Sequence, residues 1–167
     1  MSFQNPSQEK IFQYLDEAQV IAVVGFSDKP EKTSYQIAEV LKTHGYKLYG
    51  VNPKLAGQTI NDIPVVESLT AVPETIDIVD IFRRSEFLPA VAEEFLKTDA
   101  KVFWAQLGLS NEEAAKMLQD QGRHGYRYGS VCEDRIKQKS VMLELILLKK
   151  KLKMPFQKQD RLFFELF

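Results

Sequence analysis

Residues 20–27 read Val-Ile-Ala-Val-Val-Gly-Phe-Ser, an apolar run that ends at a glycine and a hydroxyl side chain. Such a run predicts a strand covered on both faces, followed by a turn in which Gly25 permits close approach of the backbone. After a polar loop, residues 35–43 carry apolar side chains at helical spacing, and residues 46–51 return to extended structure. This succession predicts a βαβ unit whose glycine turn offers backbone N–H groups to phosphate.

The turn differs from the dinucleotide-binding fingerprint in two places. That fingerprint requires Gly-x-Gly-x-x-Gly, whereas here only Gly25 is present and Ser27 stands at the second glycine. It also requires an acid at the end of the second strand, where this chain has Asn52, Pro53 and Lys54. The site is therefore predicted to hold a phosphate-rich ligand rather than a bare ribose. Two plainer interpretations stay open, with Asn52 a turn former before the proline and Lys54 a solvated surface lysine.

Length and composition restrict the class of protein. The 167 residues fit a single domain over residues 1–167, and the net charge of −1 favours neither nucleic acid nor an acidic membrane as a partner. One cysteine, Cys132, excludes an internal disulfide framework and agrees with a reducing compartment. The first residues lack the pattern of a signal peptide, and no apolar run approaches the length of a membrane span. We expect a cytoplasmic globular protein.

The rest of the chain alternates between strands and helices. Further strands are expected at 64–66 (an edge strand), 76–82, 101–105 and 126–131, and further helices at 8–16, 86–96 and 111–121. Ser34, Ser85 and Ser110 are expected to cap the helices that follow them. The predicted fold class is α/β: a three-layer, Rossmann-like open parallel sheet of five to six strands with helices on both faces. Residues 133–167 are predicted to form an appended C-terminal helix and aromatic tail.

Four segments are expected to meet at one edge of this sheet, because ligands of open parallel sheets bind beyond the carboxyl ends of the strands, at the switch point. They are Gly25-Phe26-Ser27, Asn52-Pro53-Lys54, Phe82-Arg83-Arg84 and Gln106-Leu-Gly108.

Together these segments resemble the CoA-binding family of small Rossmann-type proteins, and the resemblance extends to the CoA-binding domain of the succinyl-CoA synthetase α subunit. It covers roughly residues 20–137, and the matching pieces are Val23–Ser27, Thr33–Tyr35, Gly50–Pro53, Asp77–Arg84 and Trp104–Gly108. The resemblance implies that coenzyme A or an acyl-CoA is the ligand.

The same resemblance assigns positions along that ligand. It implies that Gly25, Phe26 and Ser27 approach the pyrophosphate, and that Ser34 and Tyr35 lie at the mouth of the helix. It places Asn52, Pro53 and Lys54 along the nucleotide, with Lys54 available to the ribose phosphate. Cys132 precedes Asp134, Arg135 and Lys137, whereas in relatives the cysteine lies among the equivalents of these residues.

The remaining polar residues are interpreted one by one. Alternation along the strand sends Arg83 and Arg84 to opposite sides, so we expect Arg83 to face the crevice and Arg84 to pair with a surface acid. At least one of Asp77 and Asp80 is expected to be hydrogen-bonded or paired near the edge of its strand, and both are expected to have structural rather than catalytic roles. Trp104 is expected to be a core residue. Gln106 at its strand end could bind the pantetheine or another ligand amide.

The sequence thus predicts a protein that binds coenzyme A without catalysis of its own, with no catalytic residue and no metal ligand. An NAD-dependent oxidoreductase or redox sensor in the same crevice is the first alternative. A scaffold that docks, or self-associates, through residues 133–167 is the second.

Overall fold

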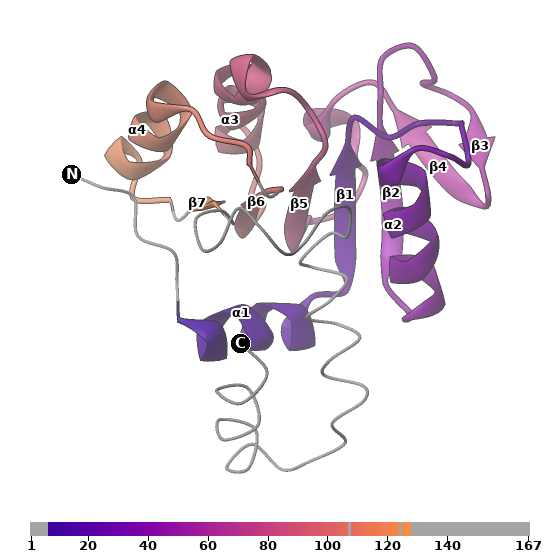
Figure 1. Ribbon diagram of the computed structural model, residues 1–167, viewed down its shortest axis with the longest axis horizontal. Helices are drawn as coiled ribbons and strands as arrows, with labels where there is room; N and C mark the ends of the chain where they lie inside the picture. Colours follow the sequence, from indigo (N-terminus) through magenta and orange to yellow (C-terminus); the bar gives the residue numbers. More distant parts are fainter. Residues whose placement is uncertain (1–6, 107, 124, 128–167) are drawn as a thin grey trace.

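The computed structural model describes residues 7–106, 108–123 and 125–127, and these form one seven-stranded sheet in the order β3-β4-β2-β1-β5-β6-β7 (Figure 1). The strands are β1 Val20–Val24, β2 Lys47–Val51, β3 Thr59–Ile60, β4 Ile63–Val66, β5 Ile78–Ile81, β6 Val102–Ala105 and β7 Gly125–Arg127. Every pairing is parallel except that of β3 with β4. The predicted Rossmann-like architecture is confirmed, although the sheet has seven strands rather than five or six.

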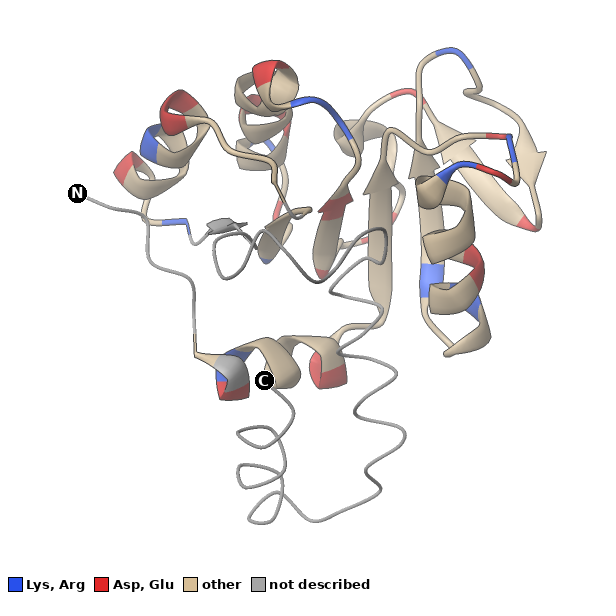
Figure 2. Ribbon diagram, viewed as in Figure 1, with Lys and Arg blue, Asp and Glu red and all other residues tan. Residues whose placement is uncertain are grey.

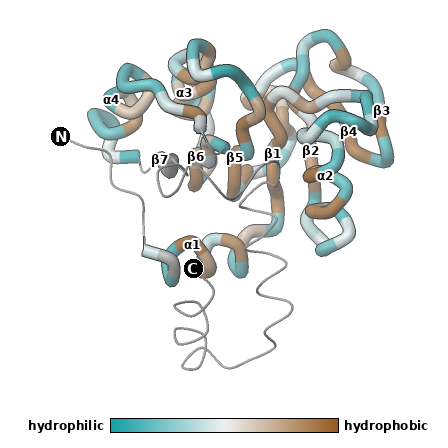
Figure 3. Tube along the Cα trace, viewed as in Figure 1, coloured by the Kyte–Doolittle hydropathy of each residue, from teal (hydrophilic) through white to brown (hydrophobic). Residues whose placement is uncertain are grey.

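Four α-helices in the described residues cover the two faces of the sheet. They are α1 Gln8–Glu17, α2 Thr33–Thr43, α3 Leu88–Leu96 and α4 Glu112–Asp120. One apolar cluster packs α1 and α2 against alternate residues of the strands, and a second packs α3 and α4 against the residues between them. Because side chains alternate across a strand and both faces are covered, the central strands are mainly apolar, as the brown colour of β1 in Figure 3 shows.

The order of the strands places the switch point between β1 and β5. From β1 the chain proceeds outward through β2 to β4, and it then crosses to the other side of β1 to form β5, β6 and β7. The loops after β1 and β5 therefore leave neighbouring strands in divergent directions. This is where an open parallel sheet leaves room for a ligand.

Three predicted helix caps are wrong, for local reasons. Ser34 lies inside α2, buried, and the N-cap position belongs to Lys32. Ser85 begins a 3₁₀ turn, Ser85–Phe87, because Pro89 fits only the first turn of the α-helix that follows. Asn111, rather than Ser110, caps α4, and its side chain accepts a hydrogen bond from the Ala114 N–H.

The outer edge of the sheet also differs from the prediction. The expected edge strand, β4, has an outer neighbour, since β3 returns against it through a two-residue hairpin. Asn61 and Asp62 form that hairpin with φ values of +50° and +58°, a conformation that Asn and Asp tolerate better than other side chains. Residues 128–131 of the last predicted strand, Cys132 and the predicted C-terminal helix and tail lie outside the described residues.

One close contact holds the start of the βαβ unit together. A Cβ atom at Gly50, the last residue but one of β2, would overlap the ring of Phe26. Phe26 is only 1% exposed, and its ring stacks on Tyr35 of α2 with centroids 6.3 Å apart. Gly50 is therefore needed for space, because the ring occupies the volume over β2 that a side chain would fill.

Gly50→Ala is expected to lower the free energy of unfolding by about 1–3 kcal/mol, the usual cost of overpacking a core. The cost should shrink in a Phe26→Leu background, because an aliphatic branch can turn away where a planar ring cannot. Urea denaturation of the two single variants and the double variant measures this coupling. Equal costs in both backgrounds would contradict it.

Candidate functional site

Backbone hydrogen bonds join the three strand ends at the switch point. The Gly25 N–H donates to the Val51 carbonyl over 3.0 Å, and the Phe82 N–H donates to the Val24 carbonyl over 2.8 Å. Residues that follow β1, β2 and β5 therefore meet at one edge, as predicted (Figure 1). Gln106 follows β6, the next strand along this edge.

Gly25 makes the tightest contact at this edge. Its φ is +82°, and a Cβ atom there would lie 2.5 Å from the Phe82 carbonyl oxygen and 3.2 Å from Cδ of Arg83. Only glycine adopts this conformation at such a distance from a neighbouring backbone. The aliphatic stem of Arg83 consequently lies against the glycine turn.

Asn52 fastens the loop after β1 to the loop after β2. Its Nδ2 donates to the Phe26 carbonyl over 2.8 Å, and its Oδ1 accepts from the Lys54 N–H over 3.0 Å. The second bond is the turn-forming role considered for this residue. The first explains why no acid stands here, since a carboxylate could not donate to the Phe26 carbonyl.

The side chains after Gly25 take structural positions. The Phe26 ring is in the core, so any contact of this residue with a ligand would come from its backbone. The Ser27 hydroxyl accepts from the Lys29 N–H over 3.2 Å and shapes the polar loop. Tyr35 is half-buried on Phe26, which ties the first turn of α2 to the glycine turn.

Helix α2 begins without a side-chain cap. Its N-cap residue, Lys32, makes no side-chain bond to the first turn, and the carbonyl of Lys32 accepts from the N–H groups of Tyr35 and Gln36. The first N–H groups of a helix have no partner within the helix, and they carry partial positive charge. This end of α2 can therefore accept an anion.

Basic residues lie in the loops along this edge (Figure 2). The three loops at 26–32, 52–58 and 82–87 hold five cations and three carboxylates. The cations, all exposed, are Lys29, Lys32, Lys54, Arg83 and Arg84. The rim thus has an excess of two positive charges, although the whole chain has a net charge of −1.

The two adjacent arginines have different partners. Arg84 lies 3.7 Å from the Glu86 carboxylate, which confirms that one of them pairs with a surface acid. The Arg83 guanidinium lies over the Phe87 ring, 5.0 Å from its centroid, and makes no ion pair within the described residues. Phe87 was absent from the predicted site; its position four residues after Arg83 was the available signal.

The two aspartates of the central strand region also differ. Asp77 accepts from the Gln19 and Val20 N–H groups and pairs with Lys101 at 2.6 Å. Burial opposes ionisation there, but the hydrogen bonds from Lys101, Val20 and Gln19 prevail and lower the pKa of Asp77. Its predicted structural role is confirmed.

Asp80 is fully buried in β5, and its Oδ1 accepts from Nε2 of Gln106. Burial raises the pKa of Asp80 to about 7, although the hydrogen bonds from Gln106 and the Ile81 backbone oppose the shift. Trp104 lies in the core as predicted. Gly108 is exposed with a φ of +82°, and Leu107 lies outside the described residues.

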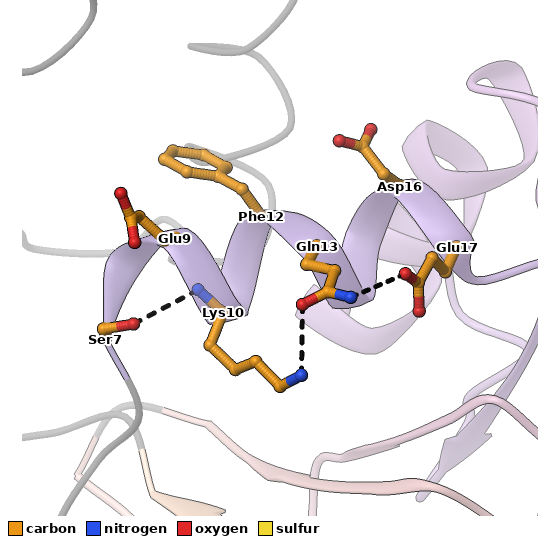
Figure 4. Close-up of a pocket in the computed structure, with 7 residues that line it drawn as sticks. All are labelled: Ser7, Glu9, Lys10, Phe12, Gln13, Asp16 and Glu17. Carbon is orange, nitrogen blue, oxygen red and sulfur yellow. Dashed lines mark hydrogen bonds between the residues drawn. The ribbon is translucent and has the colours of Figure 1, made fainter. Parts of the chain in front are cut away.

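A separate hollow lies along α1, at the amino end of the sheet (Figures 1 and 4). All of its lining residues come from α1 and its cap: Ser7, Glu9, Lys10, Phe12, Gln13, Asp16 and Glu17. No strand-end residue contributes to it. Within the described ranges no cluster of His, Cys, Asp and Glu could hold a metal ion, and no helix is long and apolar enough to span a membrane.

These features are those of a Rossmann-like α/β domain, a class that binds nucleotides at the edge described here. The chain belongs to the CoA-binding domain family, whose sequence pattern matches residues 19–132.

Relatives of two kinds are similar to it. The uncharacterised protein YneT of Bacillus subtilis is 50% identical over 123 residues, which cover 72% of this chain and 87% of YneT. The α subunit of an ADP-forming acetate–CoA ligase of Pyrococcus furiosus is 33% identical over 116 residues, 65% of this chain but 25% of the subunit. The chain thus spans about a quarter of that ligase subunit.

Solved structures show the same fold. The Thermus thermophilus protein cell-free ID.343 superposes with a TM-score of 0.70 at 28% identity, over 73% of this chain and 91% of that one. A hypothetical protein from Pyrococcus horikoshii gives 0.67 at 30% identity, over 76% and 91%.

Asn52→Asp is expected to lower the free energy of unfolding by about 1–3 kcal/mol at neutral pH, because the Phe26 carbonyl loses its donor and faces a carboxylate. The loss should diminish in acid, where the protonated carboxyl can donate again. Chemical denaturation at several pH values measures it. Lys54→Ala is the control, because the backbone N–H of residue 54 can still donate to Asn52 in that variant. A similar loss of stability in Lys54→Ala would contradict the role of Asn52 in fastening the loop.

Asp80→Asn is expected to change how stability depends on pH. With its pKa raised from 3.8 to about 7, Asp80 keeps a proton when folded that it releases when unfolded, so wild-type stability falls as pH rises through this window. The variant should gain on the order of 3 kcal/mol relative to wild type between pH 4 and pH 8.

Asp77→Asn is the matched control for that measurement. Its lowered pKa stabilises the fold above the ordinary pKa of aspartate, and this contribution disappears as pH falls below that value. Its difference from wild type should therefore vary only in acid. Urea midpoints across this pH range give both curves, and a flat difference for Asp80→Asn would overturn the assignment.

Proposed function

We propose that the chain binds coenzyme A, free or acylated, at the carboxyl ends of β1, β2, β5 and β6, without catalysis of its own. The observation that carries the proposal is the pair of anion-binding features beside the Gly25 turn. One is the uncapped N-terminus of α2, and the other is Arg83, which has no acid partner among the described residues. Membership of the CoA-binding domain family supports coenzyme A as the class of ligand.

The rim fits a ligand with several phosphates. Gly25 exposes backbone where a side chain is excluded, and the N–H groups at the start of α2 suit the pyrophosphate. Arg83 can make paired hydrogen bonds to phosphate oxygens through the edge of its planar guanidinium, because Phe87 contacts the flat face. Lys54, exposed on the loop after β2, is available to the ribose phosphate of coenzyme A.

The distal part of the ligand would extend along β5 and β6. In this direction the rim presents Phe82 and Arg83, and then Gln106 and Gly108. Bound coenzyme A supplies a thiol that can carry an acyl group as a thioester. The residues of this chain would bind and orient that arm.

The geometry favours coenzyme A over NAD. An acid at the end of β2 would bind the ribose hydroxyls of NAD, but Asn52 is already bonded to the loop after β1. His44, one of the two histidines of the chain, lies at the far end of α2, where its Nδ1 is 2.7 Å from the Val40 carbonyl oxygen. Neither observation supports hydride transfer at this edge.

Calorimetry of the full chain with coenzyme A, acetyl-CoA, NAD and ATP tests the proposal. Coenzyme A should bind more tightly than NAD, and Arg83→Ala should weaken it roughly tenfold, the effect of losing a hydrogen bond to a charged group. Arg84→Ala is the matched control and should change the affinity little, because that arginine pairs with Glu86. Absence of coenzyme A binding at millimolar concentration, or tight NAD binding, would overturn the function. Equal effects of the two variants would overturn only the assignment of Arg83.

A further inference from the structure

Asp80 is the least expected side chain of the core. It has no solvent exposure, and its Oδ2 has no hydrogen-bond partner among the described residues. A buried polar atom without a partner costs free energy, so its presence in a central strand needs a reason. The coenzyme-binding role proposed above does not use it.

The position of Asp80 connects it with the ligand edge. It is the last residue but one of β5, opposite Val23 of β1 and Trp104 of β6. The switch point lies between β1 and β5, and β6 is the next strand beyond β5. The one side chain that bonds to it in the described residues, Gln106, follows β6 at its carboxyl end.

This hydrogen bond fixes which edge of the Gln106 carboxamide turns toward the core. An ionised carboxylate only accepts hydrogen bonds, so it requires the NH2 group of Gln106 and turns the amide oxygen away. A protonated carboxyl has one O–H donor and can bond to the amide oxygen instead. In that arrangement the carboxamide is reversed, and its NH2 group turns away.

We propose that Asp80 is a positioning residue of the ligand site, and that its protonation state decides whether Gln106 presents an acceptor or a donor to the ligand. With Asp80 ionised, the Gln106 oxygen accepts from an amide N–H of the pantetheine arm. With Asp80 protonated, the NH2 group faces that arm and the bond is lost. The inference rests on the proposed binding of coenzyme A.

Within the part of the chain that the structure describes, the surroundings of Gln106 leave Asp80 as the group that titrates here. Its raised pKa lies within the physiological range. The strand residues beside it, Val23 and Trp104, carry no titratable group. The titratable residues described in the apolar cluster on this face are three tyrosines: Tyr14 of α1, Tyr35 of α2 and Tyr46, whose pKa is raised further by burial.

The charged groups nearest along the chain belong to other contacts. Asp77, three residues before Asp80, is held by Lys101 and by the backbone at the start of β1. Arg83, three residues after it, lies over Phe87. Both are exposed to solvent to some degree, whereas Asp80 is not.

The test is the affinity for coenzyme A between pH 5.5 and 8.5, measured by calorimetry on the wild type and Asp80→Asn. Affinity of the wild type should rise with pH by about fivefold more than that of the variant, which is the effect of one hydrogen bond. Ionisation of the ligand's 3′-phosphate, near pH 6, is common to both proteins and cancels in their ratio. Dephospho-CoA, which lacks that phosphate, should give the same ratio.

Gln106→Leu separates positioning from a general effect of the buried charge. It removes the amide but keeps Asp80, so its affinity should lose the extra pH dependence. Parallel pH profiles for wild type and Asp80→Asn would overturn the proposal. So would an Asp80→Asn protein that is folded but binds no coenzyme A at any pH, because a neutral isostere should bind with intermediate affinity.

A measurement without ligand distinguishes failure of this inference from failure of the proposed function. The side-chain amide signals of Gln106, followed by ¹⁵N NMR in the free protein, should shift with a midpoint near neutral pH and should not do so in Asp80→Asn. If the wild type bound no coenzyme A, the function would fall, and this titration would still decide whether the pair reverses. A Gln106 amide insensitive to pH would overturn the inference, whatever the ligand.

Discussion

The close approach of three loops at the carboxyl ends of β1, β2 and β5 is the constraint on which the site depends. Gly25 accommodates the Phe82 carbonyl at a distance that excludes any side chain, and Asn52 ties the following loop to the end of β2. Because these contacts involve backbone atoms, they tolerate little displacement. They fix where a ligand phosphate would meet backbone N–H groups, and they hold Arg83 beside that point.

The same contacts explain the departures from the dinucleotide fingerprint. An ionised acid at position 52 could not donate to the Phe26 carbonyl. Asn52 therefore fastens the loop after β1, at the position where the fingerprint has the residue that binds a ribose. The second glycine of the fingerprint is replaced by Ser27, whose hydroxyl shapes the loop through Lys29. The hydrogen bonds of Asn52 thus occupy the place of the ribose recognition group, and under our proposal the basic rim recognises the ligand instead.

Much of the fold was predictable from local pattern. Apolar runs located β1, β2, β4, β5 and β6, and spacing located the helices, because burial imposes a period on the sequence. The helix starts were predicted less well: Ser34, Ser85 and Ser110 were each chosen as caps, and none of them is one. Serine favours several local conformations equally, so its presence before a helix does not determine which residue adopts the cap geometry. The Asn61-Asp62 hairpin had a recognisable turn sequence and was missed.

The sequence by itself determined the class of the fold, its family and the four strand-end segments. Each of these depends on motifs whose residues are close together in the chain. Only the tertiary structure decided what the individual side chains do. It placed Phe26 in the core, identified Glu86 as the acid beside Arg84, and paired Asp80 with Gln106 across 26 positions. Partners and burial depend on residues brought together by strand order, and that order is a property of the folded chain rather than of any segment of it.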